Sequence, residues 1–252
     1  VNVEPAAASW KGTASVTAYT RAPSNYELGA HGIHHGTFRF EKGDASLRSE
    51  KSLEARFQAN STASTSKWDW RIQAFSALHQ DFIALGPSAT FAPISHAGQI
   101  YTFDAVNAFR TGLEASLTTS RGGWSASADG SLLGQWDVAT GLGLPFTTPA
   151  QLNATIGRNL RSNHQLTISC RAIADAKLTA RNEAPTDGTF LWGMGWSLAR
   201  KAGTWSINLH NASNTAWLDH TSAYRALGLA AQGRWMQISF TTSVKRSKKN
   251  KQ

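Results

Sequence analysis

Apolar and polar side chains alternate with a period of two along most of the chain. Around position 168, for example, Leu166, Ile168 and Cys170 are separated by Thr167 and Ser169. Successive side chains of a β-strand point to opposite faces of the sheet, so this pattern predicts strands with one apolar face and one polar face.

Ten segments carry the alternation and are predicted to be strands. Many exceed the usual strand length of about 5–6 residues in globular proteins and reach the roughly 9–11 residues needed to cross a bilayer at a tilt. We therefore predict an all-β protein whose fold is a transmembrane antiparallel β-barrel. The predicted strands span residues 11–21, 50–61, 67–84, 99–119, 123–136, 151–160, 164–179, 188–200, 204–212 and 233–244.

The connections between these segments alternate between short and long. Outer-membrane barrels have short periplasmic turns and long outer loops, so every long connection is expected on the outer surface. The short connections are residues 62–66, 120–122, 161–163 and 201–203, and the long ones are residues 22–49, 85–97, 137–150, 180–187 and 213–232.

The aromatic residues favour a membrane barrel over a soluble fold. The chain has ten Trp and eleven Phe but no apolar run of the about 20 residues that a transmembrane helix needs. A soluble β-sandwich also alternates, yet it would bury its aromatic residues between short strands and would not sort its connections by length. We therefore place the protein in the outer membrane of a Gram-negative cell, in contact with lipid. Candidates for an interfacial aromatic girdle are Trp68, Trp136, Phe190, Trp205 and Trp235.

The formal net charge of +9 does not indicate nucleic-acid binding, because much of it lies in residues 245–252. We expect residues 1–244 to form a partial barrel and residues 245–252 to form a basic disordered tail. The single cysteine, Cys170, excludes an internal disulfide and lies on an apolar face of its segment.

Several short motifs resemble those of a known family. Residues 21–28, RAPSNYEL, resemble the "RAP…EL" segment of TonB-dependent receptors, and residues 30–37, AHGIHHGT, resemble its continuation in haem-uptake and metal-uptake members. Residues 112–114, GLE, resemble a "G-hydrophobic-E" strand, and residues 211–234 are similar to the closing "N-x-x-N-x-x-Y…H…GR" segment. Residues 20–23, TRAP, and 44–47, DASL, depart from the "FRAP" and "NPNL" boxes that bracket a histidine in haem receptors.

This resemblance implies a receptor for the active uptake of an iron compound, such as haem or a siderophore, or of a metal such as zinc. Such receptors close at about 22 strands around a plug. The chain is then expected to supply about ten carboxy-terminal strands, with the plug domain and the amino-terminal half of the barrel absent. The implied partners are that missing half and the TonB-ExbB-ExbD complex, which acts through the plug.

The cluster of His31, His34 and His35 concentrates potential ligands on one long connection. Neutral imidazole binds zinc and is a common axial ligand of haem iron. We therefore expect the outer loops to capture the compound, with His34 and His35 as metal ligands and no permanently bound cofactor. Solvated loop histidines without a ligand remain the alternative. The expected binding residues are His31, His34, His35, Tyr26, His96 and His220, with Glu41 as a nearby oxygen donor.

No arrangement of residues predicts an enzyme. Asp219, His220 and Ser222 lie in one short stretch, but a catalytic triad needs its members to converge from separate positions beside an oxyanion hole. Two alternatives to a receptor remain open: a truncated, non-transporting barrel remnant and a passive porin-like channel.

Overall fold

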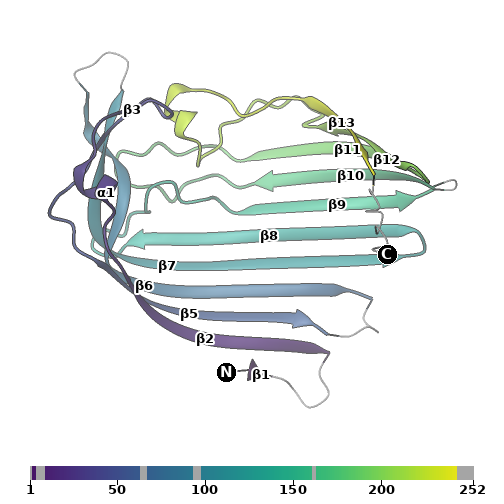
Figure 1. Ribbon diagram of the computed structural model, residues 1–252, viewed down its shortest axis with the longest axis horizontal. Helices are drawn as coiled ribbons and strands as arrows, with labels where there is room; N and C mark the ends of the chain where they lie inside the picture. The colour runs from purple at the N-terminus through teal and green to yellow at the C-terminus, as the bar shows by residue number, and fades with distance from the viewer. Residues whose placement is uncertain (1, 4–8, 63–66, 93–97, 161–162, 243–252) are drawn as a thin grey trace, which may run out of the picture.

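The long strands form one curved antiparallel sheet in which neighbours along the chain pair with each other (Figure 1). The computed structural model describes residues 2–3, 9–62, 67–92, 98–160 and 163–242. Within these residues the sheet runs in the order β1-β2-β5-β6-β7-β8-β9-β10-β11-β12-β13, and no pairing joins its two ends. The all-β antiparallel prediction is confirmed. The strands of this order are β1 (Asn2–Val3), β2 (Trp10–Arg21), β5 (Glu50–Ser61), β6 (Asp69–Phe91), β7 (Gln99–Arg121), β8 (Trp124–Asp137), β9 (Gln151–Asn159), β10 (His164–Ile173), β11 (Thr189–Arg200), β12 (Gly203–His210) and β13 (Trp235–Thr241).

Each of the ten predicted segments overlaps one of the long strands, and two bounds differ appreciably. β6 continues to Phe91, past the predicted end at residue 84, because it stays paired with β7 beyond two register shifts. β10 ends at Ile173 rather than at residue 179, since the Oδ1 atom of Asp175 accepts a hydrogen bond from the backbone N–H of Gly188, 2.8 Å away. Residues 63–66, 93–97, 161–162 and 243–252, which include parts of predicted connections, the end of the last strand and the basic tail, lie outside the described residues.

The connection between β2 and β5, predicted as a long outer connection, contains regular structure. It holds the helix α1 (Asn25–Gly29) and a hairpin of β3 (His31–His34) and β4 (Arg39–Lys42). β4 also pairs in parallel with β7, at Phe40 with Ile100 and at Lys42 with Thr102. The hairpin is therefore fixed by a partner that lies some sixty residues further along the chain, which local sequence does not indicate.

The cross-strand register gathers the apolar positions of every long strand on one face. Val16 pairs with Ala55, Leu53 with Leu78, and the same face continues through the remaining strands. Its large side chains are exposed, and Ile168 in the middle of β10 is 64% exposed. Residues of this face include Leu113, Leu132, Leu152, Ile156, Met194, Ile207, Ile238 and Phe240.

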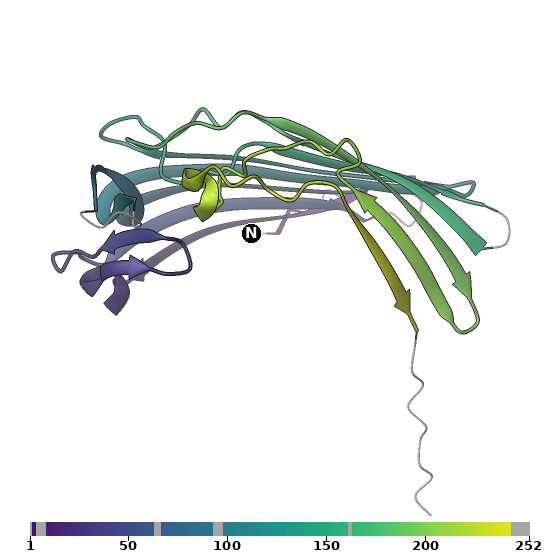
Figure 2. The same ribbon diagram turned by 90° about the horizontal axis from the view of Figure 1, so that it is seen from above.

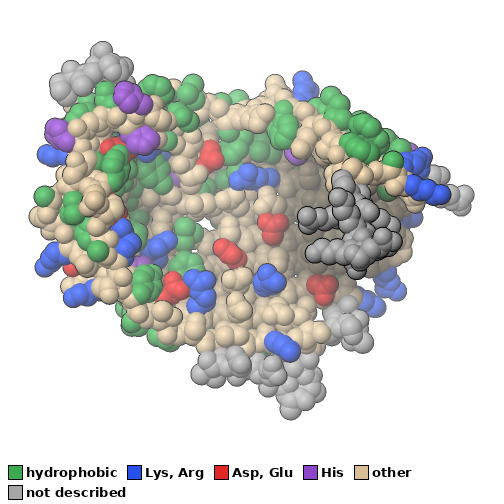
Figure 3. Space-filling view, in the orientation of Figure 1, with side chains coloured by type: hydrophobic (Ala, Val, Ile, Leu, Met, Phe, Trp, Pro, Cys, Tyr) green, Lys and Arg blue, Asp and Glu red, His purple; other side chains and the backbone are tan. Residues whose placement is uncertain are grey.

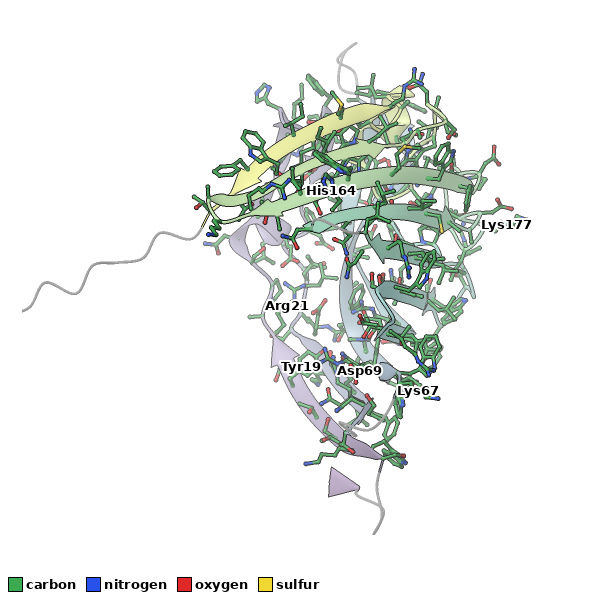
Figure 4. All side chains as sticks on the ribbon, turned by 90° about the vertical axis from the view of Figure 1, so that its right-hand side faces the viewer. Tyr19, Arg21, Lys67, Asp69, His164 and Lys177 are labelled. Atoms are coloured by element: carbon green, nitrogen blue, oxygen red, sulfur yellow. The ribbon has the colours of Figure 1, made fainter. Side chains whose placement is uncertain are left out.

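The opposite face of the sheet is polar and concave. Gln73 pairs with Glu114, Ser116 with Asp129 and Thr155 with Ser169, so polar residues follow one another from strand to strand. Figure 3 shows this face hollowed at its centre, with acidic and basic side chains on a largely polar surface. Viewed along the strands, side chains project from both sides of the arc (Figure 4). Many charged residues of the long strands also lie on the polar face, among them Glu54, Arg56, Asp69, Arg71, Glu114 and Arg171.

The long connections lie at one end of the sheet and the short ones at the other, as the sequence predicts (Figure 1). The turn between β7 and β8 consists of Gly122 and Gly123, with φ angles of 57° and 80°. Two consecutive positive φ angles suit the tightest hairpin turns and favour glycine at both positions.

We call the long paired strands of the sheet the wall. Buried apolar residues gather beyond its loop end. Ile83, Tyr101, Phe103, Leu144 and Ala176 are each less than 9% exposed, and all belong to the loop-end extensions of strands or to the connections. We call this part, residues 22–49, 82–92, 98–106, 138–150, 174–188 and 211–234, the loop layer. It contains the largest part of the conventional core in the described structure.

The described part of the chain contains no helix that is both long and apolar enough to span a membrane.

Candidate functional site

The predicted ligand cluster lies on the β3–β4 hairpin, on the concave side of the sheet at its loop end (Figure 2). His31, His34 and His35 are all exposed. The His31 ring meets Phe40 edge to face at a centroid distance of 5.3 Å, and the Nδ1 atom of His34 lies 3.2 Å from the hydroxyl of Thr37. The hairpin therefore presents imidazoles to the surroundings.

The geometry of the hairpin does not combine these imidazoles into a preformed metal site. His31 and His34 are three residues apart in one strand, so their side chains point to opposite faces of the hairpin. Among the described residues there is no group of three or more His, Cys, Asp or Glu side chains that could hold a metal ion. The hairpin can offer single imidazole ligands to a metal complex that brings its other ligands with it.

The structure brings Tyr26 and Glu41 together, and their side chains form a hydrogen bond with each other. The phenol of Tyr26 donates a short hydrogen bond to the Glu41 carboxylate, which belongs to a residue only 4% exposed. Burial raises the pKa of Tyr26 to about 12, and the Glu41 carboxylate adds to this increase. Tyr26 also packs edge to face on Phe103 at 5.7 Å. The phenol therefore stays protonated and helps to hold the hairpin on β7.

The helix α1 is fixed to the end of β2 by charge and by its own cap. Ser24 accepts a hydrogen bond from the Glu27 backbone N–H, and the Glu27 carboxylate accepts one from the Ser24 backbone N–H, a capping box. Arg21, labelled in Figure 4, donates to Glu27 at 2.9 Å and to Glu50 at 2.7 Å. The hydrogen bond from Arg21 lowers the pKa of the Glu27 carboxyl group.

His220 lies apart from the hairpin histidines, in a buried polar cluster. It is 2% exposed, and its Nε2 atom is 3.6 Å from the Glu183 carboxylate, which is itself 2.8 Å from Arg225. Burial lowers the pKa of the His220 imidazole, and the positive charge of Arg225 lowers it further. His220 therefore binds other loop residues in this structure.

Two arginines connect this cluster to the hairpin. The guanidinium group of Arg39, in β4, lies 4.3 Å from the Tyr101 ring centre and 4.6 Å from that of Phe146, while Arg225 lies 5.6 Å from Phe146. Burial lowers the pKa of Arg39. We call these residues, together with Glu183 and His220, the loop cluster: Arg39, Tyr101, Phe146, Glu183, His220 and Arg225.

The loop cluster joins four connections and the start of β7 into one body. The Glu183 carboxylate accepts hydrogen bonds from the backbone N–H groups of Phe146, at 3.0 Å, and Ala180, at 2.9 Å. At the hairpin tip, the Tyr224 hydroxyl donates to the carbonyl of Gly36 at 2.6 Å. Arg39, Glu183 and Arg225 were not predicted as important residues, because their contacts join segments far apart in the sequence. His96 lies outside the described residues.

No family model and no curated protein matches the chain in sequence. Solved structures do match, although at low identity. The "Copper transporter OprC" has a TM-score of 0.77 at 15% identity, over 95% of this chain and 38% of that one. The FrpB iron transporter from Neisseria meningitidis has a TM-score of 0.64 at 14% identity, over 91% of this chain and 36% of that one.

The siderophore receptor PirA from Acinetobacter baumannii has a TM-score of 0.62 at 13% identity, over 91% of this chain and 38% of that one. The chain thus spans less than two-fifths of the length of the structures it matches. The names of these three structures describe two transporters and a receptor. At such low identity the likeness establishes the fold alone, and that fold is the β-barrel region of TonB-dependent receptors.

Proposed function

We propose that the chain forms part of the wall and the outer loops of an outer-membrane receptor that takes up a metal or iron compound. The alternation across the strands is the observation that carries this proposal. It gives a continuous apolar face that suits hydrocarbon and a polar concave face that suits a watery or plugged interior. The names of similar structures, which describe copper, iron and siderophore transport, support the same class of cargo.

The two open edges of the sheet require further strands. Among the described residues, β13 pairs only with β12, and β2 pairs with β5 but meets β1 at only two residues. Unpaired backbone groups are costly in lipid, where water cannot satisfy them. We propose that the complementary strands of the barrel close both edges, and that the TonB-ExbB-ExbD complex supplies energy through a plug domain held against the polar face.

The distribution of sulfur ligands argues against copper(I) as the cargo. The chain contains one cysteine and two methionines, and Cys170, Met194 and Met236 all lie on the apolar face. Copper(I) prefers thiolate and thioether ligands, which this wall does not offer to the interior. The exposed hairpin histidines offer imidazole instead, which suits haem iron or zinc. We therefore propose haem or a zinc or iron complex as the cargo, with His31, His34 and His35 making the first contact.

In this proposal the other predicted residues support the histidines. Tyr26 holds the hairpin through Glu41 and Phe103, and His220 helps to join the loops that surround it. Their replacement should weaken capture through loss of loop order rather than through loss of a metal ligand.

The test compares the chain, assembled with the complementary strands of the barrel in liposomes, with a His34→Ala, His35→Ala double variant in the same assembly. Haem binding is followed by the Soret absorbance and zinc binding by calorimetry. We expect the double variant to bind at least one of these ligands about tenfold more weakly, the equivalent of about 1.4 kcal/mol. The control is His164→Ala, because His164 lies at the opposite end of the wall, where it accepts a hydrogen bond from Trp196 at 3.0 Å (Figure 4). Unchanged affinity of the double variant for both ligands would remove the histidines from the proposal.

A further inference from the structure

The apolar face of the wall carries basic residues but no acidic ones. Between the loop layer and the short turns, no Asp or Glu of the described strands shares the face of Leu53, Leu113 and Leu132. The polar face, by contrast, mixes acidic and basic residues. The basic residues of the apolar face are Lys51 at the loop end and Arg121, Arg158 and Arg200 at the short-turn end. The apolar face therefore has a net positive charge, most of it at the short-turn end.

Two of these arginines lie in one row with a tryptophan. Arg121, the last residue of β7, pairs with Trp124, the first residue of β8, and Trp124 pairs with Arg158 in β9 (Figure 1). Directly paired residues of antiparallel strands point to the same face, so the two guanidinium groups flank one indole. Neighbouring strands are about 4.8 Å apart, which separates the backbones of the two arginines by about 10 Å. Two arginine side chains can span that distance and meet at one small group between them.

Contacts at the β7–β8 turn position Arg158 within this row. Its guanidinium group lies 4.8 Å from the ring centre of Trp124, and its Nη1 atom donates to the carbonyl of Gly122 at 2.9 Å. A guanidinium group has five N–H donors, so this bond leaves Arg158 able to donate outward as well. Among the described residues, neither Arg121 nor Arg158 forms an ion pair. The charge of the pair is therefore not neutralised within the described protein.

Aromatic residues indicate the depth of this row in a membrane. Trp124 is 54% exposed, and Trp205 and Phe240 are exposed on the same face at the same end. Exposed aromatic residues at the end of a barrel strand mark the boundary between hydrocarbon and headgroups. With the apolar face in lipid, Arg121 and Arg158 lie at the level of the lipid phosphates. Guanidinium groups bind phosphate oxygens through paired, charge-assisted hydrogen bonds.

We propose that Arg121, Trp124 and Arg158 bind the headgroup of an anionic phospholipid in the leaflet next to the short turns. The phosphate lies between the two guanidinium groups, and the indole packs against the glycerol backbone. A headgroup with an ammonium group would need an acidic partner, which the described part of this face does not offer. Phosphatidylglycerol, which has a net negative charge and no ammonium group, fits the site. The site depends on the proposed function only for the contact between the apolar face and lipid.

The experiment titrates the chain, assembled with the complementary strands of the barrel in detergent micelles, with phosphatidylglycerol or with phosphatidylcholine of identical acyl chains. Native mass spectrometry resolves the individual bound lipids. We expect the first phosphatidylglycerol to bind about tenfold more tightly than the first phosphatidylcholine, because two basic residues meet an anionic headgroup. Equal affinities overturn the proposal. The titration involves no cargo, so a barrel without metal uptake can still show the preference, and a receptor active in uptake can lack it.

Matched variants locate the site. The double variant Arg121→Gln, Arg158→Gln should bind phosphatidylglycerol about tenfold more weakly, and Arg121→Gln alone about threefold to fivefold more weakly. Arg71→Gln removes one charge at the same end of the wall but on the polar face, so the lipid preference should stay unchanged. Affinity for phosphatidylcholine should be the same in all variants, which distinguishes a lost site from a lost fold. An equal loss in Arg71→Gln and Arg121→Gln overturns the assignment.

Discussion

The wall and the loop layer of this protein are stabilised in different ways. The wall is a backbone ladder whose large apolar side chains remain exposed, such as Leu53 at 50% and Ile156 at 56%. The loop layer buries Tyr101 and Leu144 almost completely and adds the buried ion pair of Glu183 and Arg225. The loop layer is thus built like a soluble protein, whereas the wall lacks an apolar core of its own.

This difference shows which part of the chain depends on its solvent. The apolar face of a β-barrel wall is stabilised by the hydrocarbon outside it. Apolar and polar side chains therefore need only alternate along each strand, and no internal apolar core is required. The loop layer instead buries apolar and charged groups of its own. Substitutions that act through lipid and substitutions that act through buried charge should therefore affect separate regions of the molecule.

The largest effect is expected from Glu183→Gln in the loop cluster. The Glu183 side chain is 1% exposed and accepts hydrogen bonds from Arg225 and from two backbone N–H groups. Its neutralisation leaves the charge of Arg225 buried without a carboxylate counter-charge, and breaking such a pair costs about 3–5 kcal/mol. Hydrogen exchange should show lost protection in residues 138–150, 174–188 and 211–234, with the wall unchanged.

The control for this change is Glu54→Gln in the wall. Glu54 pairs with Arg56 at 2.8 Å, and the Arg56 side chain is 51% exposed. Exposed pairs contribute less than about 1 kcal/mol, so little change is expected. If both variants lost protection to the same extent, or if the wall opened with the loops, the two regions would not be independent.

A smaller effect is expected from Leu113→Lys on the apolar face. Leu113 pairs with Ala74 and Leu132 on that face, so a charge there enters hydrocarbon and costs about 2–4 kcal/mol near the bilayer midplane. Ser116→Lys, in the same strand but on the polar face opposite Asp129, should be tolerated. Denaturant unfolding of the assembled barrel in liposomes measures both, and equal destabilisation by the two lysines would show that the faces are not divided between lipid and water.

The smallest effect is a dependence of loop order on pH through His220. Burial and Arg225 lower the pKa of His220 in the folded protein, while Glu183 and Asp219 oppose this shift. The unfolded imidazole binds a proton near its usual pKa of about 6.5, so the loop layer should lose stability as the pH falls below about 6.5. The loss stops growing below the folded pKa.

Hydrogen exchange, corrected for intrinsic rates at each pH, measures this dependence. His220→Gln should reduce it, whereas His35→Gln, a change at an exposed histidine, should not. Loop protection that increased on acidification of the wild-type protein would show that His220 gains a proton on folding.

The sequence predicts the wall well because its pattern is local. Alternation alone defines both faces of β5, whose bounds Glu50–Ser61 agree with the predicted segment. One error could have been avoided by the same rule. Trp235 was a candidate for the interfacial girdle, but it alternates with Met236 in β13 and stacks on His210 on the polar face. By contrast, Trp205 and Phe190 are 50% and 58% exposed, as girdle residues should be.

The loop layer was predicted poorly because its contacts are not local. β4 pairs with β7, and Glu183 meets both His220 and Arg225 from another connection. Neither contact leaves a periodic pattern in the sequence. Composition could identify the hairpin histidines as potential ligands, but it could not show that His31 and His34 face opposite sides of a strand.

Site-directed spin labelling along β10 tests the central claim most directly. With Cys170 replaced by Ala, single cysteines at Leu166, Thr167, Ile168 and Ser169 are labelled in the assembled barrel in liposomes, and their accessibility to oxygen and to a water-soluble nickel chelate is measured. Oxygen concentrates in hydrocarbon and the chelate stays in water, so labels at 166 and 168 should favour oxygen and labels at 167 and 169 should favour the chelate. Accessibility that does not alternate, or positions 166 and 168 shielded from both reagents, would contradict a wall with one face in lipid.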